Sequence, residues 1–174
     1  MKTTPDNQDS RKHTITWQDP KISARNANAI SGIDYLRGIL SGKVQPPPAA
    51  NLIGYKIAEV KRGGTVFELE PAEYHYNPFA SVHGGIACTL LDTTMTAAVL
   101  STLEIGYACS TTEIKVNFIR PISARTGKVR CEAETIHVGR RLATASAKVV
   151  DTAGKLYAHG VTTCMIFRVP ASTA

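Results

Sequence analysis

The segment that most constrains the fold is residues 74–103, which read YHYNPFASVHGGIACTLLDTTMTAAVLSTL. Asp92 is the only Asp, Glu, Lys or Arg in this stretch. From Gly85 onward the sequence is compatible with a helix that is apolar on nearly every side, which is typical of a buried helix and not of an amphipathic one. The run is too short and too rich in threonine to make a good membrane span. It therefore predicts a long central helix that other elements enclose.

Strand-like patterns flank this segment on both sides. Before it, two runs are separated by Arg62-Gly63-Gly64, and a glycine pair at such a position is typical of a tight hairpin. After it, apolar and polar residues alternate with period two, which indicates antiparallel strands with one covered face. We expect an α+β fold in which a curved antiparallel sheet of about six strands wraps around one long central helix. The expected strands cover residues 52–61, 65–70, 113–118, 128–134, 143–149 and 156–167.

The N-terminal segment has a different character. Residues 1–25 are polar and contain Pro5 and Pro20, which predicts a loosely ordered arm. Apolar residues at helical spacing predict a helix from about residue 28 to Gly42, followed by a stiff linker at the prolines 46–48. We therefore expect an arm over 1–25, a helix and Pro-rich linker over 26–48, the main domain over 49–168 and a tail over 169–174.

The chain carries 20 Lys and Arg against 14 Asp and Glu, a net charge of +6. A modest positive field attracts anions without identifying one, and a solvated basic surface explains the number equally well. No aromatic–basic motif accompanies the charge, so we expect no nucleic-acid partner.

The cysteines and the N-terminal residues indicate the cellular compartment in which the protein works. The four cysteines contain no CxxC pair, which predicts buried free thiols in a reducing environment. The sequence shows neither a signal-peptide core nor a membrane span. We therefore expect a cytoplasmic protein with no membrane partner.

Asp92 needs an explanation because an unpaired carboxylate is costly to bury. An exposed helix edge or a distant arginine partner would supply one, but the surroundings favour a functional role. Helical spacing places Cys88, Asp92 and Thr96 on one stripe, and Gly84 and Gly85 begin the helix two turns earlier. The first amides of a helix lack internal acceptors and carry the positive end of its dipole. The glycine pair is either a plain turn or an oxyanion-binding site, beside which a carboxylate could act as base or nucleophile.

Three short motifs together resemble those of a known family. Asn77-Pro78, Val82-His83-Gly84-Gly85 and Leu91-Asp92 resemble the hotdog-fold acyl-CoA thioesterases, in particular the type associated with phenylacetate degradation and 4-hydroxybenzoyl-CoA hydrolysis. The resemblance extends over residues 50–168. It implies the hotdog fold and hydrolysis of an acyl-CoA thioester to a free acid and CoA, a reaction for which we expect no cofactor. It also implies a homodimer or homotetramer with sites at the subunit interface.

The resemblance further implies catalytic roles for five residues. The amide of Gly84 polarises the thioester carbonyl, and Asp92 of the neighbouring subunit acts as base or nucleophile. Asn77 orients the thioester or water, and Thr96 helps to hold water or the carboxylate. His83 matches the histidine that precedes the glycines.

We expect five further residues to bind the substrate. Gly85 is expected to contact the substrate, and Tyr76 and Phe79 to line the acyl pocket together with the long helix. Arg140 and Arg141 belong to a basic cluster in a strand–strand turn, and guanidinium groups are well shaped to hold the phosphates of CoA. A solvated turn explains either arginine nearly as well.

Two other functions stay open. A hotdog hydratase or dehydratase acting on enoyl thioesters needs a histidine and an acid in partnership, which His83 and Asp92 could supply. A non-catalytic acyl-CoA-binding module would bind ligand and hydrolyse nothing. A serine hydrolase, a dinucleotide fold and a metal site are disfavoured, because the sequence lacks GxSxG, GxG and the usual histidine spacings.

Overall fold

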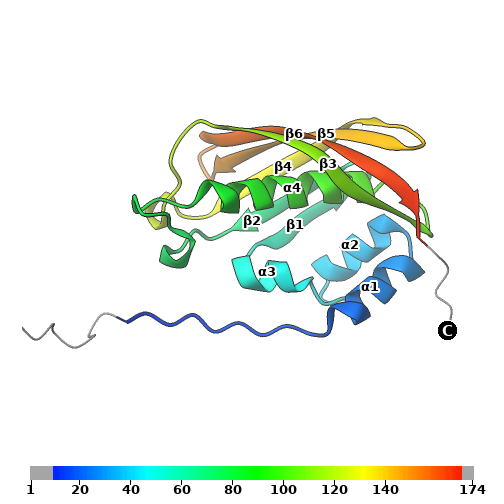
Figure 1. Ribbon diagram of the computed structural model, residues 1–174, viewed down its shortest axis with the longest axis horizontal. Coiled ribbons are helices and arrows are strands. Elements are labelled where there is room, and N and C mark those ends of the chain that lie inside the picture. The colour runs from blue at the N-terminus through cyan, green and yellow to red at the C-terminus, as the bar shows by residue number, and fades with distance from the viewer. Residues whose placement is uncertain (1–9, 170–174) are drawn as a thin grey trace, which may run out of the picture.

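The structure is a computed structural model that describes residues 10–169, so the predictions for residues 1–9 and 170–174 lie outside the described part. One long helix lies against the inner face of a curved sheet, and three short helices from the N-terminal segment lie on its other side (Figure 1). The α-helices are α1 (Pro20–Ala29), α2 (Gly32–Leu40), α3 (Pro48–Ile53) and α4 (Gly84–Leu100).

The sheet has six antiparallel strands in the order β1-β2-β4-β5-β6-β3, so β1 and β3 are its edges. This confirms the expected hotdog fold of a six-stranded curved sheet around a central helix. The strands are β1 (Lys56–Lys61), β2 (Gly64–Leu69), β3 (Tyr107–Phe118), β4 (Val129–Val138), β5 (Leu142–Asp151) and β6 (Leu156–Arg168).

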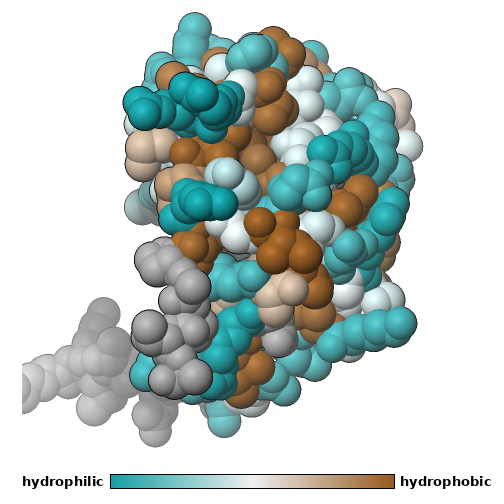
Figure 2. Space-filling model, turned by 90° about the vertical axis from the view of Figure 1, so that its right-hand side faces the viewer, coloured by the Kyte–Doolittle hydropathy of each residue, from teal (hydrophilic) through white to brown (hydrophobic). Residues whose placement is uncertain are grey.

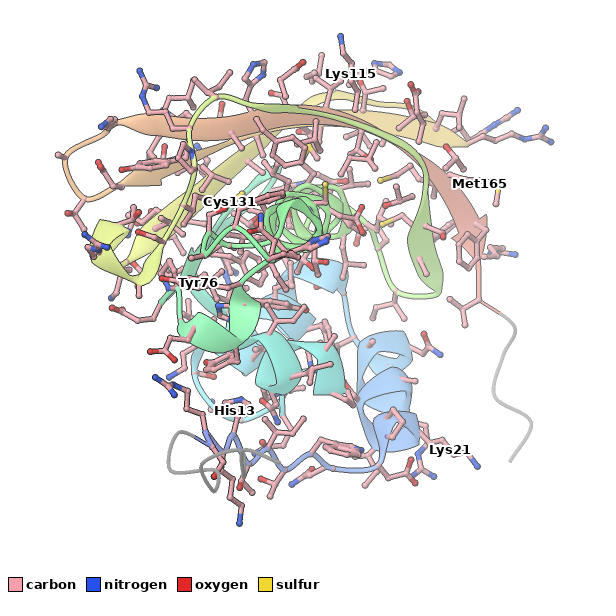
Figure 3. The ribbon with its side chains drawn as sticks, turned by 60° about the vertical axis from the view of Figure 1, so that its left-hand side comes forward. His13, Lys21, Tyr76, Lys115, Cys131 and Met165 are labelled. Atoms are coloured by element: carbon pink, nitrogen blue, oxygen red, sulfur yellow. The ribbon has the colours of Figure 1, made fainter. Side chains whose placement is uncertain are left out.

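The core lies between α4 and the inner face of this sheet. Leu91 and Met95 of α4 are fully buried, and Cys131 of β4 is buried against the helix. Figure 3 shows that Cys131 points toward α4, whereas Lys115 and Met165 point outward from the sheet. Because α4 is covered by the sheet on one side and by α2 on the other, it is apolar nearly all round, as its sequence predicts.

The N-terminal segment is more structured than the sequence analysis predicted. Helix α1 begins at Pro20, inside the expected arm, and the side chain of Asp19 accepts a hydrogen bond from the Lys21 amide at 2.9 Å. An Asp cap followed by proline at the first helical position is a start signal. The helix expected over residues 28–42 begins at Gly32, because Ser31 is extended and caps α2 instead.

The first expected strand also starts later than predicted. Residues 48–53 form α3, with Pro48 at its first turn, so the proline linker is shorter than expected. The helix ends at Gly54, whose φ of 85° is left-handed and favours glycine. Strand β1 therefore begins only at Lys56.

Helix α2 packs directly on the end of α4. The Gly32 amide donates a hydrogen bond to the Leu103 carbonyl at 3.1 Å. A β-carbon at Gly32 would overlap the Leu100 carbonyl oxygen, so this contact requires glycine. The N-terminal helices are thus attached to the same core as the sheet.

The outer surface is mixed in character. Figure 2 shows apolar patches among hydrophilic ones on one end of the molecule. Within residues 10–169, no helix combines the length and apolar character needed to span a bilayer. In the same range, no three His, Cys, Asp or Glu side chains converge as a metal site would require.

Candidate active site

Asp92 lies midway along α4, is partly buried, and lines a cavity of about 960 Å³. Thr111 of β3 donates a hydrogen bond from its Oγ1 to Asp92 Oδ1 at 2.7 Å. Thr96, one turn further along α4, lies with its Oγ1 3.0 Å from Thr111 Oγ1. The structure therefore brings Asp92 and Thr96 together, as the sequence predicts, and adds Thr111 as the hydroxyl that links them.

A buried tyrosine lies beside this carboxylate. Tyr55 is 5% exposed and lines the same cavity. Burial raises the pKa of Tyr55 above its usual value, and the negative charge of Asp92 raises it further. The hydroxyl is therefore neutral and supplies the cavity with a polar group close to Asp92.

Gly84 begins α4 at the other end of the site. His83 caps the helix, and its Nδ1 accepts a hydrogen bond from the Gly85 amide at 2.9 Å. Among the described residues no acceptor is bonded to the Gly84 amide, so Gly84 and not Gly85 offers the open N–H. A β-carbon at Gly84 would lie 3.2 Å from the Phe118 ring.

The two halves of the expected site are separate within one chain. Gly84 lines a second cavity of about 310 Å³ together with Phe118 and Arg120, and Asp92 is not part of it. Eight residues of helix separate Gly84 from Asp92, a rise of about 12 Å. A single thioester carbon cannot contact both groups of the same chain.

Asn77 organises the loop before the helix. Its Oδ1 accepts a hydrogen bond from the Phe79 amide at 2.9 Å, and its Nδ2 lies 3.1 Å from Ser81 Oγ. This turn brings Ala80 to a φ of 57°. Asn77 lines neither of the two cavities described above, so its side chain is engaged in its own turn in this chain.

Tyr76 and Phe79 also lie away from the Asp92 cavity in this chain. The Tyr76 hydroxyl accepts a hydrogen bond from the Ala124 amide at 2.9 Å, and Phe79 is 88% exposed at the tip of the loop. The cavity wall opposite Asp92 comes instead from the N-terminal segment, chiefly from α2 and α3. This wall was not predicted from the sequence.

Two other basic residues near Arg140 and Arg141 in the sequence, Arg130 and Lys128, form ion pairs with carboxylates. Arg130 is paired with Glu59 and Glu68 on the outer face of the sheet, and Lys128 also contacts Glu68 at 2.8 Å. These two cations are therefore largely neutralised by neighbouring carboxylates.

Other arginines lie closer to the two ends of the site. Arg120 lines the cavity of Gly84 and donates to the Leu156 carbonyl at 2.6 Å. Arg140 and Arg141 are exposed in the turn between β4 and β5, beside the end of β6 that pairs with the start of β3. They lie at the opposite end of β3 from Gly84 in the same chain.

The thiols near the site have shifted pKa values, raised for Cys88 and Cys109 and lowered for Cys164 by its hydrogen bond with Cys109. Burial raises the pKa of Cys88. A hydrogen bond with Cys164, together with burial, raises the pKa of Cys109. All four cysteines are free, Cys131 and Cys164 being buried and the other two partly buried.

The sequence model of the thioesterase superfamily matches residues 79–158. The 1,4-dihydroxy-2-naphthoyl-CoA hydrolase of Listeria monocytogenes is 30% identical over 104 residues, which are 60% of this chain and 83% of that protein. Human acyl-coenzyme A thioesterase 13 is 31% identical over 56% of this chain and 69% of its own.

The solved structures include a phenylacetic acid degradation-related protein of Ralstonia eutropha JMP134. It is 30% identical, has a TM-score of 0.69, and is matched over 98% of its length and 75% of this chain. The chain belongs to the thioesterase superfamily. This confirms the resemblance to hotdog-fold thioesterases that the motifs around His83, Gly84 and Asp92 indicated.

Sequence reasoning missed Thr111 and Tyr55. Thr111 precedes the predicted start of its strand at residue 113, and a bulge between Thr111 and Glu113 breaks the alternation, so extending the pattern backward would have placed Thr111 on the outer face. Tyr55 was assigned to a strand without a function. Nothing in the local sequence signals that α2 and α3 form a wall of the cavity, because that depends on how α2 packs on α4.

Proposed function

We propose that the protein hydrolyses acyl-CoA thioesters, with Asp92 of one protomer and the Gly84 amide of its partner acting on the same thioester. The observation that carries this proposal is the placement of Asp92, a half-buried carboxylate that is held by Thr111 and lines a cavity of about 960 Å³. The hydrolase names of the Listeria and human relatives support a CoA thioester as the substrate.

The groups present suit the reaction. Thr111 donates a hydrogen bond to Asp92 Oδ1, and no described residue donates one to Oδ2. Asp92 takes a proton from water, whose oxygen forms a bond to the thioester carbon. Alternatively, the carboxylate attacks that carbon directly, and the mixed anhydride left on Asp92 after CoA departs is hydrolysed by water to the free acid and the regenerated carboxylate. The Gly84 amide stabilises the oxyanion. The C–S bond then breaks and CoA departs as a thiolate, so no strong general acid is required.

The edge strand β3 supports a shared site. Its outer edge is unpaired in this chain, and exposed edges readily accept another strand. Antiparallel pairing of two β3 edges about a twofold axis would bring the Phe118 end of one strand beside the Tyr107 end of the other. Gly84 contacts Phe118, so it would approach the partner's half of β3 that holds Asp92.

The same twofold arrangement would bring arginines toward the CoA phosphates. The turn with Arg140 and Arg141 lies at the Tyr107 end of the sheet, because the Arg141 carbonyl accepts a hydrogen bond from Ile166, which pairs with Cys109. Twofold pairing would place this end of the partner nearer to Gly84. We therefore keep Arg140 and Arg141, with Arg120, as proposed phosphate contacts.

Asp92→Asn tests the role of the carboxylate. We expect kcat for CoA release to fall by at least roughly a hundredfold, while acyl-CoA binding is retained. Asp34→Asn is the matched control, because Asp34 is exposed on α2 and lines neither cavity. Near-full turnover by Asp92→Asn would refute the assignment, and hydration of an enoyl-CoA without CoA release would favour the hydratase.

Mixing two inactive variants tests the shared site. Protein carrying Asp92→Asn is co-expressed with protein carrying Gly84→Ala, so that mixed dimers form. If each site combines Gly84 of one chain with Asp92 of the other, one site per mixed dimer is intact, and roughly a quarter of wild-type activity returns. Sites built within one chain would give no recovery.

A further inference from the structure

The cavity that holds Asp92 is built by two distant parts of the sequence. One wall is α4, which contributes Asp92, Thr96 and Leu100. The facing wall is the N-terminal segment, which lies outside the residues 79–158 matched by the superfamily model. Its main lining side chains are Tyr35, Leu36, Ile39 and Leu40 of α2 and Ala50 of α3.

The chemistry of the cavity points to an uncharged occupant. Among the described lining residues, Asp92 and Lys56 carry formal charges, and His13 is the remaining titratable ring besides the tyrosines. The wall formed by α2 is aliphatic and aromatic. A carboxylate on the acyl group would lie near the Asp92 carboxylate in partly desolvated surroundings. The repulsion between the two negative charges would disfavour such a substrate.

The cavity is also large for a minimal acyl group. Its volume of about 960 Å³ is at the upper end of the range found for small-molecule sites. An acetyl group attached to the thioester would leave most of the α2 wall without contact. An acyl group with a larger apolar part would bury surface against it, which strengthens binding with each methylene buried.

The wall is held in place by several contacts. The Gly32 amide bonds to the Leu103 carbonyl beyond the end of α4, and the Ser23 and Tyr35 hydroxyls lie 2.9 Å apart across α1 and α2. Further out, Asn51 Nδ2 donates to the Thr16 carbonyl at 2.8 Å, and His13 stacks on Tyr74. Figure 3 shows His13 beneath the short helices, on the far side from the sheet. The wall is therefore a fixed part of the fold.

We propose that α2 and α3 form the acyl-binding wall of the site, so that Ile39 and Leu40 select thioesters with an uncharged, apolar acyl group larger than acetyl. This rests on the proposed function, because it places the reacting carbonyl beside Asp92. The acyl group then extends from that carbonyl toward α2.

The substrate panel is acetyl-CoA, octanoyl-CoA and benzoyl-CoA, assayed with the full-length protein. We expect kcat/KM for octanoyl-CoA or benzoyl-CoA to exceed that for acetyl-CoA by about tenfold or more, and the comparison of the two larger substrates separates alkyl from aryl groups. If the wild-type protein releases CoA from none of the three, the proposed function fails. If it hydrolyses acetyl-CoA at least as well as both larger substrates, only the acyl-wall proposal fails.

Leu40→Trp tests the wall itself. Leu40 lines the cavity and is 44% exposed, so a larger side chain there fills the cavity without entering the core. The ratio of kcat/KM for octanoyl-CoA to that for acetyl-CoA is expected to fall about tenfold. Leu52→Trp is the matched control, because Leu52 is 55% exposed on α3 and does not line the cavity. Equal ratios in the two variants would overturn the proposal.

Ile39→Ala provides a second test that does not depend on inserting a large ring. Removing this side chain enlarges the cavity, so the ratio of kcat/KM for dodecanoyl-CoA to that for octanoyl-CoA is expected to rise severalfold. Circular dichroism and the oligomeric state show whether each variant is folded. A folded Ile39→Ala protein with an unchanged ratio would contradict a role for α2 in acyl binding.

Discussion

Thr111, on the edge strand β3, donates a 2.7 Å hydrogen bond to Asp92 in the middle of α4. The bond joins the strand that is open to pairing with the carboxylate that we propose to be catalytic. It also fixes which oxygen of Asp92 is free to act on substrate, because Oδ1 is occupied.

Replacing Thr111 with valine should impair catalysis with little change in shape. The substitution removes the hydroxyl bonded to Asp92 and to Thr96 while keeping a branched side chain. Because hydrogen bonds to charged groups are stronger than average, we expect kcat to fall roughly tenfold or more. Steady-state kinetics with octanoyl-CoA measure the loss. Thr111→Ser should restore most of kcat, and failure of that rescue in a folded variant would contradict a role for the hydroxyl.

Gly84→Ala should reduce turnover by blocking the open amide at the start of α4. A β-carbon there would lie 3.2 Å from the Phe118 ring and beside the N–H that we propose for the oxyanion. The loss of one such donor costs roughly a hundredfold in kcat. The thermal unfolding midpoint and the oligomeric state serve as controls. A loss of activity fully explained by unfolding, or by dissociation of subunits, would argue against an oxyanion role.

Gly32→Ala should destabilise the contact between α2 and α4. Its β-carbon would overlap the Leu100 carbonyl, which is backbone and cannot turn aside. We expect the free energy of unfolding to fall by about 1–3 kcal/mol, measured by urea denaturation. At Gly64 the three atoms nearest to an added β-carbon all belong to the flexible side chain of Lys61, so Gly64→Ala is the control. Equal stability of the two variants would show that α2 can shift freely.

Glu68 should contribute stability that depends on pH. A hydrogen bond from Lys128 lowers the pKa of Glu68 below its usual value, and Arg130 acts in the same direction. A lowered pKa in the folded state stabilises the protein above the unfolded-state pKa and loses that effect as the pH falls through the folded-state pKa. Glu68→Gln should therefore lower the free energy of unfolding near pH 7, by about 1 kcal/mol or less because the pair is partly exposed.

The pH series decides this prediction. The unfolding curves of wild type and Glu68→Gln should converge once the pH is well below the usual glutamate pKa of 4.5. Glu70→Gln, an exposed neighbour just beyond β2, controls for the change in net charge. A difference between wild type and Glu68→Gln that persists unchanged at low pH would show that the effect is not electrostatic.

The sequence by itself determined the central helix, the sheet and the position of the carboxylate. Alternation with period two and an uncharged apolar run are local patterns, and they follow directly from which faces are buried. Asp92 was identifiable because a lone carboxylate in such a run is costly unless something uses it. The placement of Asp92 and Thr96 on one face of the helix also followed, since residues four apart are neighbours on a helix surface.

The tertiary structure alone decided what surrounds that carboxylate. Thr111 reaches Asp92 because β3 crosses α4, and Gly84 faces a different cavity because eight residues of helix separate it from Asp92. The N-terminal helices became a wall of the site because Gly32 allows α2 to meet the end of α4. Such contacts join residues far apart in the chain, and their free energy depends on packing that no local pattern encodes.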